Sequence, residues 1–112
     1  MYSNNDDGGV MYYYTYMIRC KDGSLYTGMT NNLEDRLNKH LSKKGAKYTK
    51  SHQPEKIEVA WRTKEKSLAC KLEYNIKQLT KKQKESIVSG EKIKNYFKDK
   101  IDCRRYRKII YN

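Results

Sequence analysis

The fold of this chain is constrained most by one stretch near its start, YYYTYMIRCKDGSLYTGMT, which spans residues 12–30. Tyrosine, threonine and isoleucine favour extended backbone, and an Asp-Gly pair between two such runs is a strong hairpin signal. We therefore expect one strand over residues 11–20, a tight turn, and a second strand over residues 25–30. Such a hairpin commits the start of the chain to an antiparallel sheet.

The length of the turn decides which side chains meet. If the loop is the three residues 21–23, with Gly23 in the left-handed region, counting outward places Tyr16 opposite Gly28. Because side chains alternate along a strand, Tyr26 then lies on the same face as these two residues. A two-residue loop would place Tyr16 and Tyr26 on opposite faces.

Helix signals follow the hairpin. Asn31 and Glu34 have the spacing of a capping box. Apolar residues then recur at every fourth position and predict a helix with a buried stripe; they are Leu33, Leu37 and Leu41. A basic loop containing the only proline, Pro54, ends this segment.

The second half of the chain predicts one strand and further helices. KIEVAWR, residues 56–62, alternates and predicts a third strand with its larger apolar residues on one face; these are Ile57, Val59 and Trp61. SLACKLEYNIKQL, residues 67–79, predicts a helix that buries Leu68, Leu72, Ile76 and Leu79. Thr80 with Gln83 caps a helix that reaches about Val88 and is closed by Gly90, and residues 91–100 are helical in pattern. The C-terminal CRRYRKIIYN fits a strand, a tail or a nucleic-acid contact surface.

These elements predict an α+β fold, in which a small three-stranded antiparallel sheet is flanked by helices in the order β-β-α-β-α-α. Residues 1–10 are polar and glycine-bearing, which predicts a disordered N-terminus. Residues 11–90 form the expected domain, and residues 91–112 a C-terminal helix and basic tail.

Charge narrows the class of partner. Lysine and arginine total 25 against 13 acidic residues, a formal net charge of +12, which favours a polyanion. Nucleic acid is the leading partner, and an anionic membrane surface is the rival. No apolar run approaches the roughly 20 residues that span a bilayer, and the apolar face of residues 67–79 is better explained as core. The scattered Cys20, Cys70 and Cys103 have no metal-ligand spacing, so we expect reduced thiols in a cytoplasmic protein.

Five positions together resemble the GIY-YIG endonucleases. Tyr14-Thr15-Tyr16 and Tyr26-Thr27-Gly28 are similar to the two signature tripeptides, although three of their six residues differ from the family spelling. Arg36 and His40 follow at the spacing of the family's helix motif, and Glu73 lies where the family keeps a metal-binding glutamate. GAKYT at 45–49 and EYNIKQLTKKQK at 73–84 look like the small bacterial YhbQ-like group.

The resemblance implies a chemistry for these residues. Glu73 would hold one divalent cation, Mg²⁺ or Mn²⁺, on the scissile phosphate, and Arg36 would grip phosphate oxygens through two hydrogen bonds. Tyr16 would position and deprotonate the attacking water, assisted by Tyr26 and His40, with Arg36 and the cation favouring the phenolate. Taken one at a time, the same residues have plainer interpretations: an aromatic strand, a solvated helix face, and a surface ion pair between Glu73 and Lys77.

The predicted function is thus a metal-dependent endonuclease that hydrolyses DNA phosphodiester bonds, selective for structure rather than sequence, with a role in DNA repair or recombination. No added recognition domain is expected, so a partner protein is a possible source of targeting. The alternative is a non-catalytic DNA- or RNA-binding module on the same fold. Basic and aromatic side chains are expected to contact nucleic acid: Lys43, Lys44, Lys47, Tyr48, Lys50, Lys77, Lys81 and Lys82.

Overall fold

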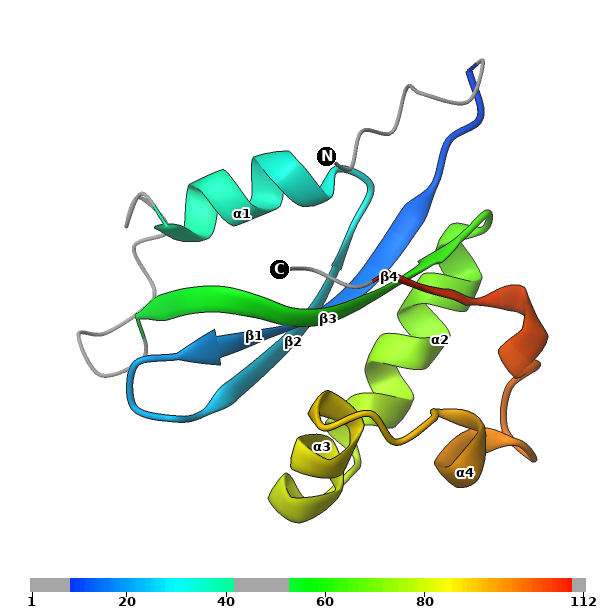
Figure 1. Ribbon diagram of the computed structural model, residues 1–112. Helices are drawn as coiled ribbons and strands as arrows, with labels where there is room; N and C mark the ends of the chain where they lie inside the picture. The colour runs from blue at the N-terminus through cyan, green and yellow to red at the C-terminus, as the bar shows by residue number, and fades with distance from the viewer. Residues whose placement is uncertain (1–8, 42–52, 110–112) are drawn as a thin grey trace.

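The structure, a computed structural model, describes residues 9–41 and 53–109, except for the side chains of residues 40 and 41. Four strands form one antiparallel sheet in the spatial order β2-β1-β3-β4 (Figure 1); they are β1 (Tyr13–Cys20), β2 (Leu25–Thr30), β3 (Pro54–Thr63) and β4 (Arg107–Ile109). The helices are α1 (Leu33–Leu41), α2 (Lys66–Lys77), α3 (Lys81–Val88) and α4 (Lys94–Phe97), with a 3₁₀ turn at Cys103–Arg105. Within the described ranges no helix is long and apolar enough to cross a membrane.

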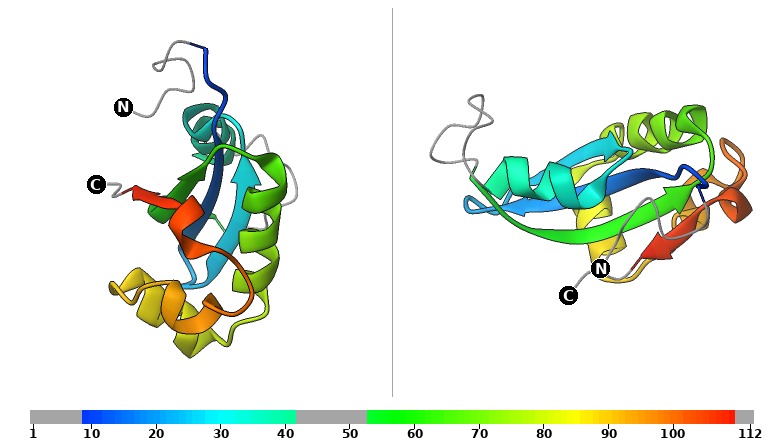
Figure 2. Two further views of the ribbon diagram at one scale, coloured as in Figure 1. Left: turned by 90° about the vertical axis from the view of Figure 1, so that its right-hand side faces the viewer. Right: turned by 90° about the horizontal axis from the view of Figure 1, so that it is seen from above.

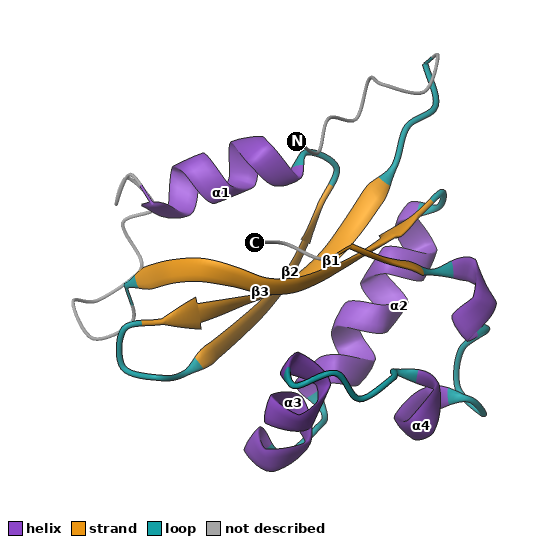
Figure 3. Cartoon of the chain, in the orientation of Figure 1, coloured by secondary structure: helices purple, strands orange, loops and turns teal. Residues whose placement is uncertain are grey.

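The predicted α+β class, with helices flanking an antiparallel sheet, is confirmed, but the prediction of three strands is wrong. A fourth strand, β4, runs beside β3 (Figure 3). In this pair Arg107 lies opposite Arg62 and Ile109 opposite Ala60. The predicted order omits β4 and is therefore incomplete, and the helix expected over residues 91–100 is confined to the shorter α4. Three residues are too few to show strand periodicity, so β4 is extended because the edge of β3 offers it hydrogen bonds.

The hairpin has the register predicted for a three-residue loop. The Cys20 amide donates to the Ser24 carbonyl at 2.9 Å, and Gly23 has a φ of 86°. This left-handed backbone is open to glycine without steric cost. Tyr16 therefore lies opposite Gly28, as expected.

Helices cover both faces of the sheet (Figure 2). On one face, α2, α3 and α4 enclose a core cluster of Met17, Val59, Trp61, Leu72, Ile76, Ile87, Ile93, Phe97 and Ile101. On the other face, α1 covers a cluster of Tyr14, Tyr16, Ile18, Cys20, Leu33, Ile57, Ala60 and Ile109. Burial on both faces explains why hydrophobic residues continue along β1 without strict alternation.

One predicted strand face is wrong. Ile57 was expected beside Val59 and Trp61, but it belongs to the cluster under α1. The register between β1 and β3 shifts at this point. Met17 lies opposite Val59, whereas the next residue of β1, Ile18, lies opposite Ile57. A bulge at Glu58, the residue of β3 between these two pairs, places the side chain of Ile57 on the opposite face of the sheet from that of Val59. A regular alternation of residues in the sequence gives no sign of such a bulge.

The helix caps agree with the sequence in one case and differ in the other. Thr80 and Gln83 form the predicted capping box at the start of α3. At α1, however, the cap is Asn32 rather than Asn31, since the Asn32 side chain accepts from the Asp35 amide at 3.0 Å. Both asparagines can cap a helix, and burial of Leu33 at its first position selects the second one.

An ion-pair network fixes the hairpin turn to α3. The Arg19 guanidinium forms two hydrogen bonds with the Glu85 carboxylate, at 2.6 and 2.7 Å, and one with Glu58 at 2.8 Å. Arg19 and Lys81 also donate to the Gly23 carbonyl, at 2.9 and 2.6 Å. The hydrogen bonds from Arg19 are the main cause that lowers the pKa of Glu85 to about 2.

This network makes a contribution to stability that depends on pH. Because the folded pKa of Glu85 lies below its ordinary value of 4.5, the stabilisation is present above about pH 4.5 and is lost as the pH falls toward 2. Urea unfolding followed between pH 7 and pH 2.5 should show a loss of stability that is smaller in Glu85→Gln. The control is Glu55→Gln, which removes an exposed carboxyl of β3. Equal pH dependence in the two variants would contradict this assignment.

Candidate functional site

The site is built around Tyr16 and the bare backbone of Gly28. A Cβ added at Gly28 would lie 2.6 Å from the Tyr16 hydroxyl oxygen and 2.8 Å from its Cζ. The Tyr16 phenol thus lies directly across the glycine, in the space that any other residue would fill. The φ of Gly28 is not in the left-handed region, so backbone conformation does not require glycine here. The requirement comes from the close approach of the Tyr16 ring.

A second tyrosine stands beside the first. The rings of Tyr16 and Tyr26 have centroids 6.3 Å apart and are tilted by 45°, a favourable aromatic arrangement. Tyr16 is only 1% exposed, whereas Tyr26 is partly exposed. Of the two phenols, Tyr26 is therefore the one nearer to solvent.

The pKa of Tyr16 is affected by residues from three elements, β2, α1 and α2. Burial is the largest cause that raises the pKa of Tyr16, and Tyr26 and Glu73 also raise it, whereas Arg36 lowers it. The sequence predicted that Arg36 would favour the phenolate, and its effect has the predicted sign. Burial outweighs it, so Tyr16 is a neutral phenol at neutral pH in the free protein.

Arg36 and His40 both lie on α1, four residues apart. Arg36 is exposed, and within the described residues no carboxylate forms an ion pair with its guanidinium. The His40 side chain lies outside the part of the chain that the structure describes. An unpaired guanidinium near a buried phenol is suited to receive an anion.

Glu73 lies on α2, and the sequence allowed two interpretations of its carboxylate, a metal ligand and an ion-pair partner of Lys77. It forms an ion pair with Lys77 at 3.0 Å, the plainer interpretation. It is also one of the charged groups that raise the pKa of Tyr16. Its side chain is 22% exposed, which leaves the carboxylate open to a ligand.

These residues fit a single divalent cation of the Mg²⁺ type. Among the described residues no three histidine, cysteine, aspartate or glutamate side chains gather as a metal cluster. Mg²⁺ needs no such cluster, because it retains waters and is commonly held by one or two carboxylates with substrate phosphate. Glu73, whose side chain is partly exposed, is the residue that could supply one such carboxylate.

The predicted nucleic-acid contacts divide into three groups. One group lies outside the described residues: Lys43, Lys44, Lys47, Tyr48 and Lys50. Lys77 and Lys81 have intramolecular partners, Glu73 and Glu85, at 3.0 and 3.2 Å. Lys82 is exposed on α3. Asn75, two residues after Glu73, is buried and donates to the Lys71 carbonyl at 2.8 Å, so its side-chain amide is engaged within α2.

A small cleft of about 300 Å³ adjoins Arg36 and contains residues that sequence analysis missed. Lys66 and Tyr13 line it with Arg36, from the starts of α2 and β1. The pairing of Tyr13 with Thr63, the last residue of β3, brings these elements together. Lys66 could have been assigned to the site only from this pairing, that is, from knowledge of the register of β1 against β3.

Comparison with known proteins shows which family this chain resembles. Residues 12–86 match the GIY-YIG catalytic domain. A UPF0213 protein of Fusobacterium nucleatum is 47% identical over 87% of this chain and 95% of its own length, and one of Clostridium perfringens is 46% identical over 77% and 95%. The solution NMR structure of a UPF0213 protein from Bacillus halodurans is 40% identical, covers 80% of this chain and 98% of its own, and has a TM-score of 0.48.

Proposed function

Because this chain belongs to the GIY-YIG family, a family of nucleases that generally use divalent metal ions, we propose that it is a metal-dependent endonuclease. Its proposed reaction is hydrolysis of phosphodiester bonds in nucleic acid, with DNA as the favoured substrate. The observation that carries the proposal is the close approach of the buried Tyr16 phenol to the bare backbone of Gly28, with the Tyr26 ring beside it. Arg36 and Glu73, which both affect the pKa of Tyr16, add an exposed cation and a partly exposed carboxylate from two helices.

Arg36 is proposed to bind the scissile phosphate. Its guanidinium is exposed, and within the described residues it forms no ion pair, so it can turn both donors toward the phosphate oxygens. Two parallel hydrogen bonds fix the orientation of the phosphate as well as its charge. Lysine supplies only a point charge and cannot do this.

Glu73 is proposed to hold the cation. When bound, a divalent cation supplies positive charge against the oxygens of the phosphate as charge develops during displacement. Glu73 is proposed as the only protein ligand, with water and phosphate completing the shell. The Lys77 ion pair holds the carboxylate in place in the free protein and is weak enough to be exchanged, since such pairs contribute a few tenths of a kcal/mol.

Tyr16 is proposed to orient the attacking water and to relay its proton. Since burial keeps the Tyr16 phenol neutral, it can accept a proton from water only as it gives up its own. Tyr26, which is nearer to solvent, and His40 are the proposed acceptors along this path. The proton taken from water thus leaves as the phenolic proton, and no buried phenolate has to persist.

Selectivity for structure rather than sequence is also proposed. The basic side chains offered to nucleic acid are mostly lysines, which neutralise phosphates without reading base edges. A role in DNA repair or recombination, targeting by a partner protein and a cytoplasmic location stay part of this proposal. A non-catalytic DNA- or RNA-binding module is the alternative. Glu73 argues against it, because a carboxylate facing phosphate lowers affinity unless a cation lies between them.

Cleavage of labelled single-stranded, duplex, flap and branched DNA tests the proposal. We expect cutting with Mg²⁺ or Mn²⁺, none with EDTA, and a rate about 10- to 100-fold lower in Arg36→Lys, as expected for a lost charge-assisted hydrogen bond. Lys39→Arg, on the same helix, is the control and should cut normally. Tight binding without cutting in either metal would reject catalysis and favour the binding module.

A further inference from the structure

A second basic surface lies at the end of the sheet where the C-terminal segment returns. A groove of about 620 Å³ is lined by five cationic side chains, two tyrosines and one threonine, and by no acidic residue. Its cations are Arg62, Lys64, Arg104, Arg105 and Arg107. Three of them follow residue 100 and lie outside the 12–86 match, so the family resemblance does not account for this groove.

Part of this charge has no ion-pair partner among the described residues. Arg104 pairs with Asp102 at 3.0 Å, and Arg105 pairs with Glu65. Within residues 9–41 and 53–109, in contrast, neither Lys64 nor Arg107 forms an ion pair. Both are exposed, so each presents a full charge to a ligand.

Two aromatic rings, those of Tyr12 and Tyr106, lie among the cationic side chains of the groove. The Arg62 guanidinium stacks on the Tyr12 ring, 4.1 Å from its centroid. The Tyr106 hydroxyl donates to the Leu68 carbonyl at 2.7 Å, which fixes this second ring on α2. Cationic side chains among fixed aromatic rings are the usual surface for a single nucleic-acid strand, since bases stack on the rings while the charges follow the phosphates.

The groove continues toward the candidate site. Tyr12 and Lys64 line the groove, whereas Tyr13 and Lys66 line the cleft beside Arg36. The two concavities are neighbours across one residue pair, because Thr63 lines the groove and its partner Tyr13 lines the cleft. A strand held at Arg36 therefore has a basic path toward the C-terminal segment.

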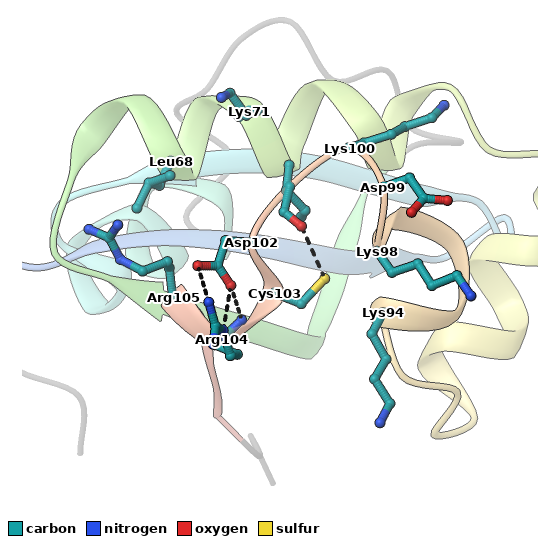
Figure 4. A pocket seen from close by; sticks show the side chains of 11 residues that line it. Leu68, Lys71, Lys94, Lys98, Asp99, Lys100, Asp102, Cys103, Arg104 and Arg105 are labelled. Atoms are coloured by element: carbon teal, nitrogen blue, oxygen red, sulfur yellow. Dashed lines mark hydrogen bonds and ion pairs between the residues drawn. The ribbon is translucent and has the colours of Figure 1, made fainter.

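A neighbouring concavity is a poorer candidate. It has a volume of about 770 Å³ and lies between α2, α4 and the C-terminal turn. In Figure 4 its lysines point in different directions, and the Arg104 side chain forms hydrogen bonds with the Asp102 carboxylate. Asp99 and Asp102 also place negative charge among its lining residues.

We propose that the groove lined by Arg62, Lys64 and Arg107 binds a single-stranded arm of the nucleic-acid substrate, one that extends from the strand held at Arg36. The substrate class is accordingly a duplex with a single-stranded flap or tail, or a single strand. The position of the arm relative to the cut rests on the proposed nuclease function, but binding of the arm does not.

The test is binding of fluorescent oligonucleotides by the full chain in EDTA, over a range of salt concentration. The double variant Lys64→Gln with Arg107→Gln removes two charges of the groove. For single strands, the slope of log affinity against log salt should become shallower by about 1.4, at about 0.7 per lost phosphate contact. The matched control, Lys21→Gln with Lys92→Gln, removes two exposed charges elsewhere and should leave the slope unchanged.

The outcomes separate this proposal from the catalytic one. Equal slopes in the two double variants would overturn the groove, even if the wild-type protein cuts DNA. An equal change for blunt duplex and single strand would overturn the single-strand assignment. A groove-specific change in a protein that never cuts would support the groove and reject the nuclease.

Discussion

Replacing Glu73 by glutamine is expected to slow metal-dependent cleavage by at least about 100-fold, since metal-ion catalysis contributes several kcal/mol. Glutamine has the same shape but carries no charge, so α2 should be undisturbed around a residue that is only partly exposed. DNA binding in EDTA should be retained or strengthened, because removal of a carboxylate lowers repulsion from phosphate. Single-turnover cleavage with excess protein measures the rate, and fluorescence anisotropy measures binding.

The control for Glu73 is its own ion-pair partner. Lys77→Gln breaks the same 3.0 Å contact but keeps the carboxylate. Its effect should be confined to DNA affinity, and saturating protein should restore the cleavage rate. Equal loss in the two variants at saturation would assign the effect to the ion pair and refute Glu73 as the metal ligand.

The hairpin was predictable because its determinants are local. The Asp-Gly pair predicts the turn, and a three-residue loop, which the sequence allowed beside a two-residue one, fixes which residues of the two strands lie opposite one another. From that register alone, Tyr16, Tyr26 and Gly28 fall on one face, and the structure has them there. The central geometry of the candidate site was therefore present in nineteen residues of sequence, 12–30.

The remaining features depend on contacts between distant segments. The bulge that moves Ile57 to the face under α1 is visible only once β3 is paired with β1. β4 requires the edge of β3, and its three residues carry no pattern of their own. The cleft residue Lys66 likewise becomes part of the site through the pairing of Tyr13 with Thr63.

The protonation of Tyr16 was also beyond the reach of sequence. The charge of Arg36 predicts a lower pKa for Tyr16, and Arg36 does lower it. The depth of burial, 1% exposure under the clustered side chains of the α1 face, is a property of the assembled fold and outweighs that charge. This is why a proton relay, rather than a standing phenolate, is the mechanism proposed here.

The Gly28→Ala variant is expected to lose about 1–3 kcal/mol of stability, the usual cost of overpacking a filled site. It should also lose cleavage activity. The added methyl would lie 2.6 Å from the Tyr16 hydroxyl and 2.8 Å from its Cζ, so the ring or the β2 backbone must move. Tyr16 has no free space to enter, being almost fully buried. Urea denaturation measures the stability, and the DNA panel measures activity.

A double-mutant cycle shows whether this clash is the cause. In the Tyr16→Phe background the closest contact, that with the hydroxyl, is absent, so Gly28→Ala should cost less than it does in wild type. The Cζ contact persists, so relief should be partial. If the cost of Gly28→Ala is the same in both backgrounds, the two residues are not coupled, and glycine at this position does not serve to seat the Tyr16 phenol.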